Sequence, residues 1–391
     1  MREAVIVAAV RSAIGKAPKG ALKDTLPENI LAPVLEEVIK RSTGLNPEEI
    51  DDIACGCSLP EAEQAFIGKI SALVAGIPTS VPAFVVNRMC ASSLEAIAIG
   101  AQKIICGGAD VVIGCGIESM SRVYPGTPKD SPTLLEKRPT ACYTMGQTAE
   151  EVAERFNVSR QRQDEFAMES HIKASKAIAE SRFKDQILPL KVKKNIAKED
   201  GTIEVQEFVF DTDEGPRLDT SLEKLAKLKT VFKENGTVTA GTSSQLSDGA
   251  AAVMIMSREK AEELGLKPLL IFKSFAVAGV DPEIMGIGPV KAVPKALKLA
   301  GLTVDQIDRI ELNEAFASQS IYCIEELGFD KEKVNPNGGA IALGHPLGCT
   351  GAKLTVQLAY ELERIKGRYG MVTMCVSLGM GAAAVFERPQ D

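Results

Sequence analysis

The sequence contains no tryptophan and only two histidines among its 391 residues. It also contains no C-x-x-C pair, although nine cysteines are present. Structural zinc sites use paired cysteines, or cysteines with histidines, at short spacings, so no metal site is predicted. No apolar run approaches the roughly 18 residues that a membrane-crossing helix needs, so no membrane span is predicted.

An excess of basic residues is also missing. The 45 lysines and arginines are outnumbered by 52 aspartates and glutamates, which gives a net charge of −7. Nucleic-acid-binding domains usually carry a basic surface, so we expect no nucleic-acid partner. The N-terminal segment lacks the apolar core and cleavage site of a secretory signal. Many cysteines without such a signal are typical of a reducing compartment, and we expect a cytoplasmic location.

The composition is that of a globular protein, with 45% hydrophobic and 25% charged residues. Apolar strands alternate with helical patterns in the first and last thirds of the chain. The predicted strands are 4–9, 110–114, 370–376 and 382–387, and the predicted helices are 28–42, 94–105, 293–300 and 354–365. This alternation predicts an α/β fold with a mostly parallel central sheet.

Two short segments suggest that the fold is duplicated. Residues 45–53 (LNPEEIDDI) and 302–310 (LTVDQIDRI) are identical at four of nine positions, and each follows a helix that ends at glycine. Residues 119–245 contain equal numbers of basic and acidic residues, whereas the parts on either side are acidic. We therefore predict an N-terminal half (1–118), an inserted loop domain (119–245) and a C-terminal half (246–391).

Cys90 is a candidate nucleophile. It lies in NRMCASS (87–93), between a predicted strand and the helix at 94–105. Unpaired N–H groups and the positive end of the helix dipole favour a thiolate at such a position. The alternative is a buried cysteine that only packs.

His345 is a candidate general base. It lies in the glycine-rich segment NGGAIALGHPLGCTG (337–351), where Pro346 favours an extended conformation of the histidine. An imidazole held in such a loop suits proton transfer near neutral pH. The alternative is a polar loop residue with a structural hydrogen bond. His171 lies in a charged helical segment and is predicted to be solvated.

Cys375 and Asn313 are further candidates. Cys375 ends a predicted strand before a glycine-containing turn, where free N–H groups could bind an oxyanion. Asn313 lies where a strand would end and a helix begin, so it could cap that helix or hold a water or a carbonyl oxygen. The run GMGAAA (379–384) fits a dinucleotide-binding pattern, but a strand follows it rather than a helix, so we discount it.

Four segments together resemble the thiolase family in order and separation: NRMCASS (87–93), NEAFA (313–317), GHP (344–346) and CVSLGMG (375–381). Supporting segments are GIESMS (116–121), MGQTAE (145–150), GTSSQLSDGA (241–250) and MGIGP (285–289). The resemblance runs nearly end to end. It implies a duplicated five-layered α-β-α-β-α core with an inserted loop domain, and a homodimer or homotetramer.

The resemblance also implies a mechanism. Cys90 would attack the 3-keto carbon of a 3-oxoacyl-CoA, acetyl-CoA would leave, and free CoA would take the acyl group from Cys90. His345 would activate Cys90, and Cys375 would protonate the departing carbanion or, in synthesis, abstract the α-proton of acetyl-CoA. His345, with a water held by Asn313, would stabilise the enolate oxygen. The N–H groups of Cys90 and Ser377 would form a second oxyanion hole.

CoA thioesters are substrates in this family, so no separate cofactor is expected. The CoA contacts implied by the resemblance are Met145, Arg217, Leu225, Phe232, Ala240, Ser244 and Phe316. Arg217 and the nearby Lys224, Lys227 and Lys229 are expected partners of the adenosine phosphates, which would explain why the insertion lacks an acidic excess.

Three residues depart from the family pattern, because the family commonly has glycine at the positions of Ser93 and Ser377 and often at Leu378. A backbone donor survives the change from glycine to serine where φ is negative, so we expect the second oxyanion hole to remain. Leu378 leaves the acyl-chain preference open. The stretch 122–144 is short beside tetrameric members, which leaves dimer and tetramer open.

Within the family, SSQLSD (243–248) and GVDPEIM (279–285) favour a degradative 3-ketoacyl-CoA thiolase. Acetoacetyl-CoA thiolase (acetyl-CoA C-acetyltransferase) is the close alternative. A non-catalytic acyl-CoA-binding scaffold on the same fold is opposed by the complete set of Cys90, Asn313, His345 and Cys375. A nicotinamide oxidoreductase and a decarboxylating ketosynthase fit less well, because the first lacks a motif in the right context and the second usually has a different triad.

Overall fold

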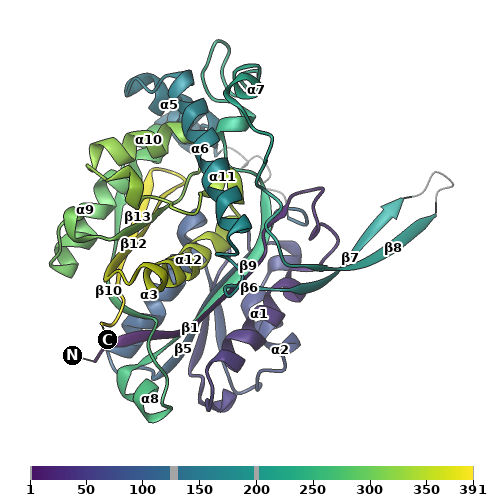
Figure 1. Cartoon of the computed structure of the whole chain (residues 1–391), viewed down its shortest axis with the longest axis vertical. Helices are drawn as coiled ribbons and strands as arrows, with labels where there is room; N and C mark the ends of the chain where they lie inside the picture. The colour runs from purple at the N-terminus through teal and green to yellow at the C-terminus, as the bar shows by residue number, and fades with distance from the viewer. Residues whose placement is uncertain (1, 124–130, 198–201, 391) are drawn as a thin grey trace.

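The computed structural model describes residues 2–123, 131–197 and 202–390. Its main sheet has eleven strands, in the order β11-β12-β13-β10-β1-β9-β5-β3-β4, with the short β2 and β6 paired to β9 and β1 (Figure 1). The strands are β1 (Ala4–Ser12), β2 (Gly15–Lys16), β3 (Asp52–Gly56), β4 (Ala83–Val86), β5 (Val111–Ser119), β6 (Ile187–Leu188), β9 (Ser247–Ser257), β10 (Leu270–Gly279), β11 (Arg309–Leu312), β12 (Tyr369–Val376) and β13 (Met380–Glu387).

The strand order repeats. In one half, β1 pairs antiparallel with β9, β9 antiparallel with β5, and β5 parallel with β3. In the other half, β10, β13, β12 and β11 follow the same antiparallel, antiparallel, parallel sequence. The halves meet where Val5 and Ile6 of β1 face Ile271 and Leu270 of β10. The predicted duplication is thus confirmed.

The two similar segments, 45–53 and 302–310, occupy equivalent places in the two halves. Residues 45–53 contain the 3-10 turn Pro47–Glu49 and enter β3, and residues 302–310 contain the turn Val304–Gln306 and enter β11. In each copy a polar residue before the turn, Asn46 or Thr303, forms a capping box with the third residue of the turn. The identical apolar positions therefore reflect the same local structure, a tight turn that starts a buried strand.

Helices form three layers around the two half-sheets, which gives the predicted five-layered core (Figure 1). Outside the first half lie α1 (Pro27–Arg41) and α2 (Ile67–Val74), and outside the second lie α9 (Gly288–Ala300) and α10 (Ala317–Glu326). Between the half-sheets, α3 (Ser92–Ile105) and α12 (Thr350–Ile365) pack on each other. The short α8 (Arg258–Glu263) connects β9 to β10.

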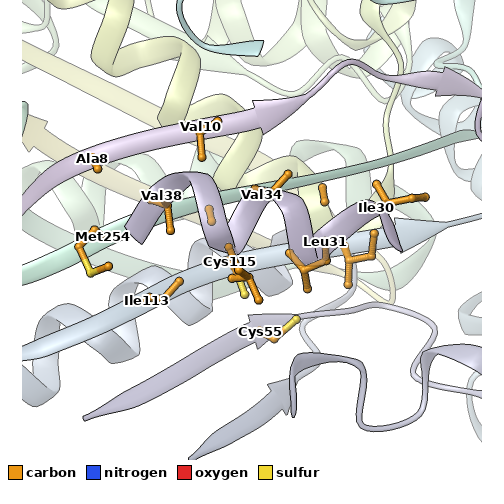
Figure 2. Close-up of a cluster of buried hydrophobic side chains, with 14 of the residues drawn as sticks. Ala8, Val10, Ile30, Leu31, Val34, Val38, Cys55, Ile113, Cys115 and Met254 are labelled. Atoms are coloured by element: carbon orange, nitrogen blue, oxygen red, sulfur yellow. The ribbon is translucent and has the colours of Figure 1, made fainter. Parts of the chain in front are cut away.

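Side chains on successive strand positions enter different layers, as the two-residue period of a strand requires. Val5 packs in the cluster under α1, whereas its neighbour Ile6 packs in the central cluster around α3 and α12. Figure 2 shows part of the first cluster, in which Ile30, Leu31, Val34 and Val38 of α1 lie beside Cys55, Ile113, Cys115 and Met254 of the strands. Cys55 and Cys115 are thus packing residues, as expected for most of the cysteines.

The insertion contains α4 (Pro132–Lys137), α5 (Met145–Arg155), α6 (Arg160–Ala179), α7 (Leu222–Ala226) and the paired strands β7 (Leu190–Ala197) and β8 (Ile203–Phe210). The β7–β8 pair projects from the body (Figure 1). Helix α6 packs against α10 and the short α11 (Ala340–Leu343), which precedes His345. The division of the chain at residues 118 and 245 stays a prediction. Strand β9 follows residue 245 in the chain but lies between β1 and β5 in the sheet.

A buried ion pair ties the insertion to the first half. Two nitrogens of Arg11 on β1 each donate to a different oxygen of Asp213 at 2.8 Å, and both side chains are fully buried. Asp213 also accepts the backbone N–H of Ile14. Because a bidentate guanidinium–carboxylate contact has a fixed geometry, it sets where the insertion meets β1.

The predicted mostly parallel sheet is wrong. Most pairings in the main sheet are antiparallel, because β9 and β13 run antiparallel to both of their neighbours. Apolar runs predict that a strand is buried but not its direction. The tight turn at 377–379 joins β12 to β13, and such a turn can only join antiparallel strands. In the described ranges, no helix is long and apolar enough to cross a membrane.

Candidate active site

The site forms where the two central helices begin side by side. The 3-10 turn Met89–Ala91, with Cys90 at its centre, leads into α3, and the turn Leu347–Cys349 leads into α12. A Cβ on Gly116 would lie 2.4 Å from the Gly348 carbonyl oxygen, so only glycine fits on β5 between the two turns. The sequence therefore brings the loops that contain Cys90 and His345 together through small residues.

Ser93 links the two helices directly. Its hydroxyl accepts the backbone N–H of Ala352, the third residue of α12, at 2.8 Å. A serine oxygen commonly satisfies an early N–H of its own helix, whereas here it satisfies one of a neighbouring helix. This hydrogen bond explains a serine at a position where the resemblance suggested glycine.

His345 is buried and held in one tautomer. The Thr350 hydroxyl donates to the Pro346 carbonyl at 2.8 Å, so it accepts from His345 Nδ1 at 2.6 Å. The other ring nitrogen, Nε2, therefore carries a lone pair and accepts from Asn313 Nδ2 at 3.3 Å. Burial, together with the charge of Lys353, lowers the pKa of His345 to about 3. A neutral imidazole can act as a base through the Nε2 lone pair once the long contact with Asn313 gives way to a substrate or thiol proton.

Asn313 is fully buried at the end of β11. Its amide nitrogen contacts His345, and its backbone N–H donates to the Thr373 carbonyl. Its side-chain oxygen Oδ1 has no donor among the residues that the structure describes. Because a buried carbonyl oxygen without a donor is costly, this atom fits a bond to a bound water or ligand.

Two buried carboxylates that the sequence analysis left without a role hold these loops. Glu118 at the end of β5 accepts the backbone N–H groups of Ser58 and Gly348 at 2.9 and 2.8 Å. Glu314 accepts the Ser170 hydroxyl at 2.6 Å and an amide N–H of Asn335 at 2.8 Å. For Glu118, the sequence signal was a lone acidic residue in an otherwise apolar or small segment, which is unusual for a buried position.

Cys90 is half-buried and faces two N–H donors. Burial raises the pKa of its thiol to about 12, with a contribution from Glu118. The backbone N–H groups of Cys90 and Ser377 act on the sulfur in the opposite direction and favour the thiolate. The helix start therefore does not produce a resting thiolate, because desolvation outweighs it. Ionisation of Cys90 requires a base.

Cys375 is fully buried at the end of β12. It packs in an apolar cluster with Met145, Phe232 and Phe316. Burial raises the pKa of Cys375 well above its ordinary value, and the neighbouring Cys90 raises it further. The structure thus brings both candidate thiols together, with different surroundings.

Comparisons with known proteins agree with this geometry. The family described as "Thiolase, N-terminal domain" matches residues 4–259, and "Thiolase, C-terminal domain" matches residues 266–388. The chain belongs to the thiolase family. It is 52% identical to the 3-ketoacyl-CoA thiolase of Bacillus subtilis (strain 168), with 99% of this chain and 100% of the relative covered.

Two further proteins with thiolase activities in their names are similar to this chain over nearly its whole length. The peroxisomal 3-ketoacyl-CoA thiolase A of Mus musculus is 49% identical, over 99% of this chain and 91% of its own length. The crystal structure of the Bacillus anthracis acetyl-CoA acetyltransferase superposes with a TM-score of 0.90 at 40% identity and covers 100% of this chain and 99% of its own. The thiolase fold is thereby confirmed.

The predicted CoA contacts of this thiolase form two adjoining groups. Arg217, Leu225 and Ala240 line a pocket of about 180 Å³ in the insertion. Met145, Phe232 and Phe316 lie in the cluster with Cys375. The groups are connected because Ser243 lines the pocket while its backbone forms a bridge to Phe316. Ser244 lies in the same segment and donates its N–H to Ala315. Their role in CoA binding stays a prediction.

His171 corrects the sequence analysis. It was predicted to be solvated, but it is 5% exposed, lines the pocket with Arg217, and accepts the Arg217 backbone N–H through Nδ1 at 3.2 Å. Burial, followed by the charges of Arg217 and Lys16, lowers its pKa to about 4. The charged helix sequence misled because the face of α6 that bears His171 is covered by the insertion's own loop.

Leu378 adopts a left-handed conformation, with φ of 63°, in the turn between β12 and β13. A side chain there costs about 1–2 kcal/mol relative to glycine, which accounts for the family's frequent glycine at this position. The Leu378 side chain is 52% exposed. The turn nevertheless presents the Ser377 N–H to Cys90.

The buried neutral histidine predicts a pH-dependent stability. The unfolded chain protonates His345 near its ordinary pKa of 6.5, whereas the folded chain does so only near 3, so stability falls as the pH drops between these values. Replacing His345 by Gln should reduce the loss of unfolding free energy between pH 7 and about pH 5 by about 2 kcal/mol. Urea unfolding at the two pH values measures this, and identical losses in both proteins would contradict it.

Proposed function

We propose that this thiolase cleaves 3-oxoacyl-CoA with CoA into acyl-CoA and acetyl-CoA through an acyl-Cys90 intermediate. The observation that carries the proposal is the pair of neighbouring thiols in opposite surroundings, Cys90 facing N–H donors and Cys375 in a buried apolar cluster. The names of the relatives at about half identity support the same reaction. The family chemistry makes the chain an acyltransferase.

In the first half-reaction, His345 Nε2 takes the Cys90 proton as the sulfur bonds to C3 of the substrate. The C2–C3 bond then breaks, and its electron pair passes to C2 of acetyl-CoA as an enolate. Cys375 gives its proton to C2, which leaves acetyl-CoA and an acyl thioester on Cys90. Before the second half-reaction, the proton on His345 passes to the Cys375 thiolate, which restores both groups. His345 then takes the proton of the CoA thiol as that sulfur attacks the acyl thioester, and returns it to Cys90 as the Cys90 thiolate leaves.

The proposed mechanism includes two oxyanion sites. His345, with a water held by Asn313 Oδ1, stabilises the enolate oxygen of acetyl-CoA. The N–H groups of Cys90 and Ser377, which point at the Cys90 sulfur region, stabilise the tetrahedral oxygen on the acyl thioester. Each such donor is worth roughly 3–4 kcal/mol of barrier, because it acts where the charge develops.

CoA itself is held by the insertion in this proposal. Arg217 at the mouth of the pocket binds phosphate groups, while Leu225 and Ala240 provide apolar contact for the rest of the molecule. Lys224 lines the same pocket but is paired with Asp219, so it is a weaker candidate for phosphate than Arg217. Met145, Phe232 and Phe316 guide the thioester end toward Cys375.

Covalent catalysis gives the first test. Incubation with acetyl-CoA should add about 42 Da to the peptide that contains Cys90, as measured by mass spectrometry. Cys90→Ser should lose the adduct and lower kcat by about a thousandfold or more. The matched control is Cys106→Ser, an exposed cysteine beyond α3, which should keep both. Normal CoA binding without any adduct on Cys90 would instead favour the scaffold hypothesis.

Chain length distinguishes the two catalytic candidates. The degradative proposal predicts comparable kcat/KM values for the thiolysis of acetoacetyl-CoA and 3-oxooctanoyl-CoA, within about tenfold. Activity confined to acetoacetyl-CoA would favour an acetyl-CoA C-acetyltransferase, the activity named for the Bacillus anthracis structure. The measurement is steady-state thiolysis at saturating CoA with the same enzyme preparation.

We also propose that the thiolase is a homodimer through the edge of the first half-sheet. Strand β4 forms that edge, and α2 packs beside it. The apolar side chains of Ile70, Leu73 and Val74 on α2, and of Phe66 just before it, are exposed. An unpaired edge next to an apolar patch is a surface that proteins normally cover. A tetramer built from two such dimers is the alternative.

Disruption of this surface gives the oligomer test. Leu73→Glu should convert the dimer to a monomer, because a charge would be buried in the apolar contact. The matched control is Leu299→Glu, which changes another exposed leucine, 68% exposed against 48% for Leu73, on α9, which packs against β10 and β13 of the other half. Light scattering after gel filtration measures the mass, and an unchanged mass for the Leu73 variant would contradict the proposed surface.

A cytoplasmic location remains our proposal for the chain. Its many cysteines fit a reducing compartment, and one relative is bacterial. The peroxisomal relatives of mouse and Arabidopsis thaliana name the alternative compartment.

A further inference from the structure

Gln319 contacts Cys375 from α10. It is fully buried, and a Cβ on Gly286 would lie 2.6 Å from the Gln319 Cβ, so glycine at 286 lets the glutamine approach this closely. The backbone N–H groups of Ala315 and Phe316 both donate to Gln319 Oε1, at 3.1 and 3.4 Å. Because two donors converge on this oxygen, the side-chain amide has a single orientation.

The same oxygen faces the Cys375 thiol. The distance from Cys375 Sγ to Gln319 Oε1 is 3.9 Å, and because a carbonyl oxygen cannot donate, the sulfur must be the donor and carry its proton. Each of the two reactive thiols meets its own backbone N–H, which favours the thiolate in both. The surroundings differ in one further group, which is the Gln319 carbonyl at Cys375, an acceptor that favours S–H, and the Ser377 N–H at Cys90, a donor that favours the thiolate.

Burying the Gln319 amide costs free energy that an apolar side chain at the same position would not lose. Its Nε2 is buried, has no nitrogen or oxygen acceptor in the part of the chain that the structure describes, and meets only the Cys323 sulfur. Because sulfur is a weak acceptor, much of the cost of burying an amide, about 1–3 kcal/mol, remains, and an apolar residue would pack at this position with less loss. Such a cost is expected where a polar group serves a function.

We propose that Gln319 is a positioning residue for Cys375, whose Oε1 keeps that thiol protonated beside Cys90 and so assigns the acid role to Cys375 and the nucleophile role to Cys90. The inference rests on the proposed role of Cys375 in proton transfer. Two neighbouring groups perform acid and base chemistry only if their surroundings separate their proton affinities. When the enolate forms, the proton moves from Cys375 to C2, and the remaining thiolate is the base in the reverse direction.

Few other groups around Cys375 could make its proton affinity differ from that of Cys90. Among the described residues, the titratable groups that raise the pKa of Cys375 are Cys90, in the turn Met89–Ala91, and Cys323 on α10. Cys323 is itself buried and donates to the Gly286 carbonyl at 3.4 Å. The contacts from α5 and from the 3-10 segment Pro282–Ile287 are apolar, through Ala149 and Met285.

The test is the pH dependence of hydrogen–deuterium exchange at the methyl group of acetyl-CoA, followed by mass spectrometry. Exchange requires the Cys375 thiolate, so its rate rises with pH through the pKa of Cys375. Gln319→Glu should shift this rise to higher pH by about 0.5 unit or more, because a carboxylate that accepts the same two N–H groups disfavours the thiolate further. Gln319→Met removes the oxygen and should shift the rise to lower pH.

Two measurements separate this role from a structural one. The rate of Cys90 acetylation by acetyl-CoA, measured in the same variants, should change by less than about threefold, because it does not use Cys375. Gln357→Met is the matched control, since Gln357 on α12 is equally buried and its amide has no partner in the described chain. It should leave the pH of the rise unchanged.

Shifts of opposite sign in the two Gln319 variants support the proposal. Shifts of the same sign, or no shift in either, overturn it, as does a parallel fall in exchange and Cys90 acetylation. If the methionine variant does not fold, the glutamate variant decides by the sign of its shift alone. Exchange that persists in Cys375→Ala would overturn the proposed role of Cys375 itself, which distinguishes that failure from a failure of Gln319.

Discussion

The close contact between the N-terminal ends of α3 and α12 is the constraint on which the rest of the site depends. Gly116 on β5 permits it, because any side chain there would collide with Gly348 and Ser93. Ser93 fastens it by accepting the Ala352 N–H, and Glu118 fastens it by accepting the Gly348 N–H. The duplicated fold places one helix from each half in the central layer, so the active site lies at the pseudo-symmetric junction of the two halves.

Within that junction, two thiols of the same chemical type acquire different tasks from their surroundings. Desolvation raises the pKa of both, so burial alone cannot distinguish them. Each thiol meets its own backbone N–H, so the two differ in one further dipole, which is the Ser377 N–H at Cys90 and the Gln319 carbonyl at Cys375. A neutral His345, held by Thr350 and Asn313, adds a base without adding a charge.

Buried acidic groups serve the architecture rather than the chemistry. Glu118 accepts hydrogen bonds from the loops at Ser58 and Gly348, and Glu314 accepts from Ser170 on α6 and from Asn335. Asp213 does the same with Arg11 and the Ile14 N–H, and it thereby anchors the insertion to β1. Because a carboxylate can accept several hydrogen bonds at once, it can pair with backbone N–H groups of irregular segments that have no partner in a helix or sheet. Burial raises the pKa of Glu118 and Glu314, whose several donors offset part of that effect.

The sequence by itself determined most of the elements and the duplication, and it singled out four candidate site residues. Helix periodicity, glycine stops and the paired turns at 45–53 and 302–310 are local signals, and Cys90 and His345 lie where local turns precede helices. Only the tertiary structure decided the strand directions and the burial of His171. The same holds for the hydrogen bonds that Glu118, Glu314 and Gln319 make. The physical reason is that their partners are distant in the chain: Gln319 meets Cys375, and Glu118 meets Gly348, only after the halves pack. Local patterns contain no information about such contacts.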